Sequence, residues 1–120
     1  METSNKLFGA TVKKIHYELS VFRKKTGLVD DLYISQHFCE RIVERNLNNY
    51  THFIFVMLSK VVQQKRQTTY SNRIYKLRWK TWIIIAKIST NDMSGKRYVI
   101  AKTIYNNDDP KIGYDEEMIF

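Results

Sequence analysis

The segment that decides the fold is residues 34–47, with the sequence ISQHFCERIVERNL. Ser35 is a favourable N-cap residue, so we expect a helix to begin there and to hold His37 in its first turn, near the positive end of the helix dipole. At 3.6 residues per turn, one stripe of this helix is polar and consists of His37, Arg41, Glu44 and Arg45. The opposite stripe is apolar and can face a core: Phe38, Cys39, Ile42 and Val43. One histidine and two arginines on an exposed helix face form a candidate phosphate site.

Two interpretations of this polar stripe stay open at this point. A single histidine on a helix is commonly a surface or capping residue, and Arg and Glu at helical spacing commonly form solvated ion pairs worth about 0.3–0.5 kcal/mol. The other interpretation is catalytic, with His37 and Arg41 acting together on a phosphate. Composition and the rest of the chain help to weigh the two.

Charge is distributed unevenly along the 120 residues, which are enough for one globular core. The whole chain carries a formal net charge of +8. Residues 108–120 hold five acidic residues and one lysine, a net charge of −4, so residues 1–107 carry +12. We therefore expect a single domain over residues 1–107, followed by an acidic tail over residues 108–120. A domain this basic predicts a polyanionic partner, nucleic acid in particular.

Several classes of protein are disfavoured by the sequence. There is no apolar run near 18 residues and no signal peptide, so we expect no membrane association and a cytoplasmic location, in a bacterial host if a phage encodes the chain. Cys39 is the single cysteine, which excludes an intrachain disulfide and suits a packed core thiol. Outside the tail the acidic residues are scattered, so we expect no metal site and no cofactor.

Helical periodicity occupies the first half of the chain. After a frayed start over residues 1–6, apolar residues at spacings of four and three predict a helix that ends at Gly27: Phe8, Val12, Ile15, Leu19 and Phe22. Residues 28–34 form a connector to the helix described above. A third helix is expected over residues 50–62, with five residues inward: Tyr50, Ile54, Met57, Leu58 and Val61. His52 in its first turn could face His37, or solvent.

Strand patterns follow in the second half of the chain. We predict an edge strand over residues 65–70, guarded by Lys65 and Arg66, and then a half-buried strand over 72–80 and a central strand over 81–88. Residues 91–95 read as a hairpin loop, and residues 97–105 as the return strand, with Ile104 on one face and Val99 and Ala101 on the other. The predicted fold is α+β, with N-terminal helices packed on a four-stranded antiparallel sheet.

RNA offers a chemistry that these residues can perform without a metal, because its 2′-hydroxyl is a built-in nucleophile. Cleavage then needs a base, an acid and cations for the charge on phosphorus. His37 can transfer a proton near neutral pH, and Arg41 can stabilise the charge. Further cations could hold flanking phosphates, unless they form a solvated surface: Arg45, Lys76, Arg78, Lys80 and Lys102. Aromatic residues could stack on bases, unless they pack in the core: Tyr75, Trp79, Trp82 and Tyr105.

The run Ser35-Gln36-His37, followed by Arg41 and Arg45, resembles the RegB family of phage endoribonucleases. The wider pattern, with the strand sequence VIAKTIY at residues 99–105, is similar to small RNase toxins of the RelE and BrnT type. The resemblance implies a helices-on-sheet RNase fold and a metal-independent, sequence-specific endoribonuclease. Such an enzyme cleaves mRNA and leaves 2′,3′-cyclic phosphate ends, with the ribosome or a ribosomal protein as an expected partner.

The same resemblance implies catalytic roles for His37 and Arg41. Enzymes of the RegB family use a second histidine on the next helix; Met57 stands at the matching position here, and His52, five residues earlier, is the nearby candidate. They also use a glutamate on the first helix, where Gly9 stands in this chain. Two alternatives to an enzyme remain: a non-catalytic nucleic-acid-binding or regulatory phage protein, and a protein-binding inhibitor that docks through residues 115–120.

Overall fold

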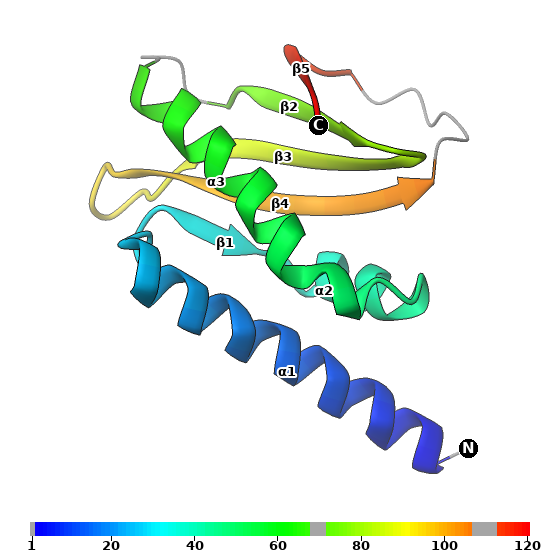
Figure 1. Cartoon of the computed structure of the whole chain (residues 1–120). Coiled ribbons are helices and arrows are strands. Elements are labelled where there is room, and N and C mark those ends of the chain that lie inside the picture. Colours follow the sequence, from blue (N-terminus) through cyan, green and yellow to red (C-terminus); the bar gives the residue numbers. More distant parts are fainter. Residues whose placement is uncertain (1, 68–71, 107–112) are drawn as a thin grey trace.

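Three helices pack against a five-stranded mixed sheet in the computed structural model, which describes residues 2–67, 72–106 and 113–120 (Figure 1). The elements in chain order are α1 (Glu2–Thr26), β1 (Leu32–Ile34), α2 (Gln36–Glu44), a 3-10 turn (Asn48–Tyr50), α3 (Thr51–Gln67), β2 (Ile74–Trp79), β3 (Trp82–Thr90), β4 (Arg97–Asn106) and β5 (Glu116–Ile119). The strand order is β1-β4-β3-β2-β5, with β1 parallel to β4 and β5 parallel to β2. The α+β class is confirmed, but the prediction of four antiparallel strands is wrong, because two short parallel strands were not anticipated.

The first helix is longer than its apolar pattern suggests. It begins at Glu2, although a frayed start was expected over residues 1–6, and it ends as predicted, with Gly27 at a φ of +74°. The Leu28 N–H donates to the Arg23 carbonyl at 2.9 Å, which satisfies one of the last carbonyls of α1. The predicted apolar face is confirmed by its buried members: Val12, Ile15, Leu19 and Phe22.

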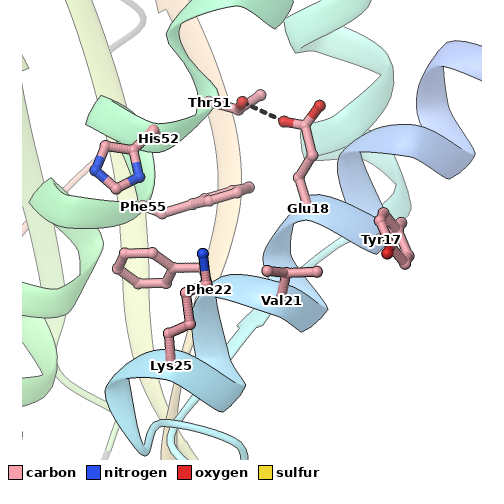
Figure 2. Close-up of a pocket in the computed structure, with 8 residues that line it drawn as sticks. All are labelled: Tyr17, Glu18, Val21, Phe22, Lys25, Thr51, His52 and Phe55. Carbon is pink, nitrogen blue, oxygen red and sulfur yellow. Dashed lines mark hydrogen bonds between the residues drawn. The ribbon is translucent and has the colours of Figure 1, made fainter.

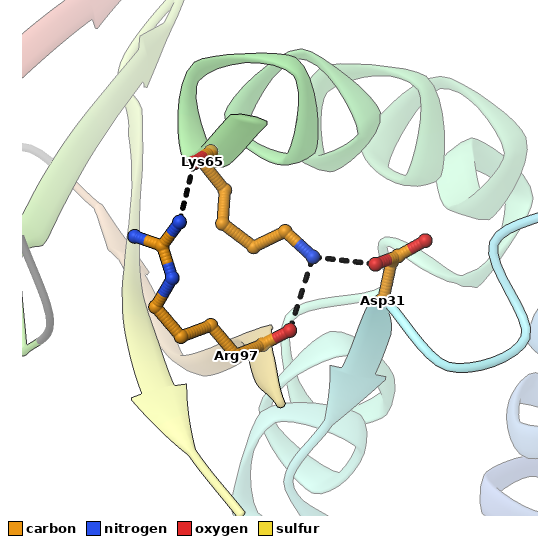
Figure 3. A network of polar contacts seen from close by, with 3 residues as sticks. All are labelled: Asp31, Lys65 and Arg97. Carbon is orange, nitrogen blue, oxygen red and sulfur yellow. Dashed lines mark hydrogen bonds and ion pairs between the residues drawn. The ribbon is translucent and has the colours of Figure 1, made fainter. Parts of the chain in front are cut away.

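The third helix continues beyond its predicted end. Residues 65–67 belong to α3 and not to an edge strand, and the rest of that predicted strand lies outside the described residues. Lys65 is only 7% exposed, and its ammonium pairs with the Asp31 carboxylate and donates to the Arg97 carbonyl at 3.0 Å (Figure 3). The Arg97 guanidinium donates back to the Lys65 carbonyl at 3.3 Å. This network ties the end of α3 to the segments that open β1 and β4.

The inward residues predicted for the third helix are confirmed with one exception. Ile54, Met57, Leu58 and Val61 are all buried. Tyr50 is 47% exposed, because it lies in the 3-10 turn before the helix and its ring contacts Trp79 from outside the core.

The three central strands confirm the predicted meander, with one irregularity. In β2, Tyr75, Leu77 and Trp79 are buried and alternate with half-exposed residues. In the β3–β4 ladder, Ile85 pairs with Thr103 and Ala86 pairs with Ala101, so Lys102 is an extra, bulged residue. Ile104 is consequently buried in the same core as Ala101, whereas strict alternation placed them on opposite faces.

Residues 113–120 do not form a separate tail, because β5 completes the sheet. The Ile74 N–H donates to the Asp115 carboxylate at 2.7 Å, and the Phe120 N–H donates to the Arg78 carbonyl at 2.9 Å. Two ion pairs accompany this pairing: Arg73 with Glu116 at 3.2 Å and Arg78 with Glu117 at 3.0 Å. The acidic segment proposed as a docking peptide is thus paired with β2 of its own chain, and residues 107–112 lie outside the described part.

The two faces of the sheet differ in character. Figure 1 shows α3 crossing in front of the sheet, with α1 and α2 towards β1, and the core lies between them. By strand register, the opposite face, here called the open face, carries Tyr33, Lys76, Arg78, Ile83, Ile85, Lys87, Tyr98, Ile100, Thr103, Tyr105 and Glu117. Ile83 and Ile85 are buried there without belonging to the helix-side core. Among the described residues, no helix is long and apolar enough to cross a membrane.

Candidate functional site

The N-terminus of α2 is attached directly to the bulge of β4. Ser35 caps the helix as predicted, because its hydroxyl oxygen accepts a hydrogen bond from the Phe38 N–H at 3.0 Å. The same hydroxyl donates to the Lys102 carbonyl at 3.1 Å, and the Ser35 N–H donates to the Ala101 carbonyl at 3.0 Å. The cap therefore fixes the first turn of α2, which contains His37, relative to β4.

The polar stripe predicted on α2 is present. The Arg41 Nε–H donates to His37 Nε2 at 3.4 Å, and Arg41 Nη1 pairs with the Glu44 carboxylate at 3.0 Å. In this contact His37 Nε2 is the acceptor, so its lone pair faces Arg41. The Arg41 and Glu44 side chains are 39% and 47% exposed, so a phosphate could compete with Glu44 for the guanidinium.

The apolar side of α2 also matches its prediction. Phe38, Cys39 and Ile42 are fully buried, and Val43 packs against the core from a half-buried position. Burial raises the pKa of the Cys39 thiol to about 12, so this residue is a packed core thiol and not a nucleophile.

A second histidine lies next to this site, and it was not the one expected. His16 of α1 is half-buried, and its Nε2 lies 3.1 Å from the side-chain oxygen of Gln36, the residue before His37. Residues 16 and 36 are on different helices, and no local pattern marks their contact. His16 was not among the candidate site residues predicted from the sequence.

His52 has other neighbours. Its ring packs edge-on against Phe22 with centroids 5.8 Å apart, in a cavity of about 310 Å³ between α1 and α3 (Figure 2). Thr51 closes one side of this cavity through a hydrogen bond to the Glu18 carboxylate. Neither His37 nor Arg41 lines the cavity, so the structure places His52 with α1 and not with His37.

Two of the basic residues expected to contact RNA from β2, Arg78 and Lys76, have partners in the C-terminal segment 113–120. Arg78 pairs with Glu117, and its hydrogen bond holds the pKa of that carboxyl below the ordinary value of 4.5. The Lys76 ammonium lies 4.9 Å from the centre of the Tyr114 ring. Lys80 is not on the strand face: it follows β2 in a left-handed conformation with a φ of 54°, and its ammonium lies 5.5 Å from the centre of the Trp79 ring.

The remaining predicted contact residues lie nearer to α2 or on the open face. Lys102 is exposed at the bulge, beside the Ser35 cap. Arg45 is exposed at the C-terminal end of α2, where its N–H donates to the Arg41 carbonyl at 3.0 Å. Tyr105 is half-buried on the open face, opposite Ile83. The aromatic rings Tyr75 and Trp79 are buried in the core and are not base-stacking surfaces.

The chain matches no protein-family model, no curated protein and no solved structure. The resemblance to RegB and RelE-type ribonucleases therefore stays a prediction, and the function has to be argued from the site itself.

Proposed function

We propose that the protein is a metal-independent endoribonuclease with a RelE-like arrangement of helices on a sheet. The observation that carries the proposal is the contact between His37 and Arg41 on a helix whose first turn is attached to β4 through Ser35. A proton-transfer group and a permanent cation on one fixed helix turn are two of the three groups that cleavage through the 2′-hydroxyl requires.

The chemistry uses residues already in contact. His37 Nε2 takes the proton of the 2′-hydroxyl, the 2′-oxygen bonds to phosphorus, and the bond from phosphorus to the 5′-oxygen breaks. For this step Arg41 releases His37 Nε2 and turns from Glu44 to the phosphate, where it stabilises the developing charge. The products are a 2′,3′-cyclic phosphate and a 5′-hydroxyl, which receives its proton from a second group.

We propose His16 for that second group, because Gln36 holds its ring at the same end of α2 as His37. His52 is the competing candidate from the resemblance, and it would have to leave its contact with Phe22 to act. Lys102 stands beside the Ser35 cap and can hold a neighbouring phosphate, with Lys76 and Arg45 as further contacts. The expected substrate is mRNA in the bacterial cytoplasm, with the ribosome or a ribosomal protein as a partner.

The test is to incubate wild type and His37→Ala with bacterial mRNA in excess EDTA and to map the new ends. We expect wild type to cut at specific sites with 2′,3′-cyclic phosphate ends, and His37→Ala to be slower by about 10²- to 10⁴-fold, the usual contribution of a general acid or base. His16→Ala and His52→Ala, as matched histidine variants, identify the second group: we expect the first to lose activity and the second to keep it. Circular dichroism and thermal melting confirm that each variant is folded.

Cleavage by His37→Ala at the wild-type rate would refute the assignment of His37. The second candidate function, a non-catalytic RNA-binding regulator, is favoured by one observation: Arg41 is already neutralised by Glu44. That candidate predicts salt-sensitive RNA binding by wild type with no cleavage in any preparation.

A further inference from the structure

Two tyrosine rings form a corner on the open face, near the β1 edge of the sheet. Tyr33 of β1 and Tyr98 of β4 have ring centroids 5.2 Å apart and ring planes at 74°. Two adjoining hollows of about 300 and 210 Å³ share both tyrosines together with Asn91 of the β3–β4 loop. A planar aromatic ligand fits a corner of this kind, because it can stack on one ring while its edge meets the other.

The corner is held in place before any ligand arrives. The Arg23 guanidinium carbon lies 5.2 Å from the centre of the Tyr33 ring, and Arg23 Nη1 donates to the Leu32 carbonyl at 3.1 Å. Arg23 thus fixes Tyr33 from the side of α1, while Tyr33 remains 39% exposed. A ring that is already positioned loses little conformational freedom when a base stacks on it.

Polar groups at the rim suit a nucleotide. The Asn91 side-chain oxygen accepts hydrogen bonds from the Met93 and Ser94 N–H groups at 2.9 and 3.2 Å. These bonds orient the amide, so its two N–H donors point away from these backbone groups. Lys96 and Asp30 both line the smaller hollow, so a cation for a phosphate and a carboxylate that can accept from a base amino group lie side by side at the rim. Aromatic stacking, an amide and a cation together recognise an unpaired nucleotide.

The tyrosine corner and the candidate site are connected by the chain segments β1–α2 and β4. His37 follows Tyr33 by four residues in the chain, and Lys102 follows Tyr98 by four residues. The hydrogen bond from Ser35 to Lys102 brings these two segments together. The residues from Tyr98 to Lys102 all lie in β4 and cover about 13 Å, a distance that a short stretch of unpaired RNA spans. An RNA strand that runs along β4 from Tyr98 towards Lys102 would therefore reach both places.

We propose that Tyr33 and Tyr98 form a subsite for one unpaired nucleobase of the RNA, about 13 Å along the strand from the bond attacked at His37. The position of the cleaved bond rests on the proposed function, whereas base binding at the corner does not. Because the rings occupy a fixed corner, the subsite selects single-stranded RNA over duplex, whose bases are stacked within the helix.

The test measures binding of single-stranded ten-nucleotide homopolymers of A, C, G and U by fluorescence anisotropy, in the His37→Ala background so that nothing is cut. Tyr98→Leu and Tyr33→Leu should weaken the best-bound oligomer by about 5- to 150-fold, the effect of removing one base–aromatic stack. Tyr98→Phe keeps the ring and should bind within twofold of its parent. Tyr17→Leu is the matched control, since Tyr17 is 69% exposed on α1 away from the sheet.

Equal affinity of the leucine variants and the parent would overturn the subsite, as would an equal loss in Tyr98→Phe and Tyr98→Leu. Absence of binding by all four homopolymers would overturn it too. Ring-dependent binding by a protein that never cleaves RNA would refute the proposed nuclease and leave the subsite standing. Cleavage that is indifferent to both rings would refute the subsite alone.

Discussion

The two edges of the sheet are secured by different forces. At one edge, Leu32 and Ile34 of β1 are buried in the core, and β1 leads straight into α2. At the other edge, β5 is held by backbone pairing, by the ion pairs of Glu116 and Glu117 and by the half-buried Met118, while Ile119 is 75% exposed. The candidate site lies at the edge secured by apolar packing. A site that must hold two side chains at a fixed separation is kept more rigid at that edge, because ion pairs near the surface weaken with salt and apolar packing does not.

The largest contrast between the edges is expected in stability. Leu32→Ala removes a fully buried side chain and should lower the free energy of unfolding by about 2–5 kcal/mol. Ile119→Ala, at the exposed position of β5, should change it by about 0.5 kcal/mol or less. Urea denaturation followed by circular dichroism measures both. Similar losses in the two variants would show that β5 is as much a part of the core as β1.

A smaller contrast is expected in the response to pH. The hydrogen bond from Arg78 lowers the pKa of Glu117 in the folded state, so this contact stabilises β5 fully above the ordinary value of 4.5 and is lost as the pH falls through the lowered pKa. The protection factors of the β5 amides in hydrogen exchange should therefore fall in acid before those of β1. Glu117→Gln should remove this part of the pH dependence. An unchanged pH profile in that variant would assign the effect to other carboxylates.

The smallest effect tests whether the two edges open independently. Cys39 lies in the core beneath α2, and its pKa of about 12 makes the native thiol unreactive at pH 8. Its rate of modification by a thiol reagent therefore reports opening at the β1 side. We expect Glu117→Gln to leave this rate unchanged and Leu32→Ala to raise it. Faster labelling in Glu117→Gln would show that the loss of β5 contacts is transmitted across the sheet.

The local sequence pattern was sufficient to predict the elements in which buried residues recur at a regular spacing. The cap at Ser35, the stop at Gly27 and the alternation of β2 all follow from single residues or short periods. β1 could not be recognised, because three residues next to Asp30 and Asp31 show no period. β5 was hidden for a different reason: Glu116 and Glu117 disfavour a strand until Arg73 and Arg78, about 40 residues away in the chain, neutralise them.

The contacts of the candidate site likewise divide into those that local spacing predicts and those that it does not. The contact between His37 and Arg41 follows from their spacing of four on one helix. The approach of His16 to Gln36 depends on how α1 crosses α2, and the corner of Tyr33 and Tyr98 depends on a strand that the sequence did not reveal. Contacts made by tertiary packing leave no trace in local periodicity, which is why these residues were missed.

The parallel pairing of β1 with β4 has a consequence for folding during synthesis. The hydrogen bond from Ser35 to Lys102 joins residues 67 positions apart, whereas β2, β3 and β4 pair through short turns. A growing chain can form α1 and α2 early, but it has no strand on which to seat them until β4 has left the ribosome. The His37 turn is therefore fixed only after β4 has been made. The activity proposed for His37 therefore requires a chain in which β4 has already been synthesised and paired with β1.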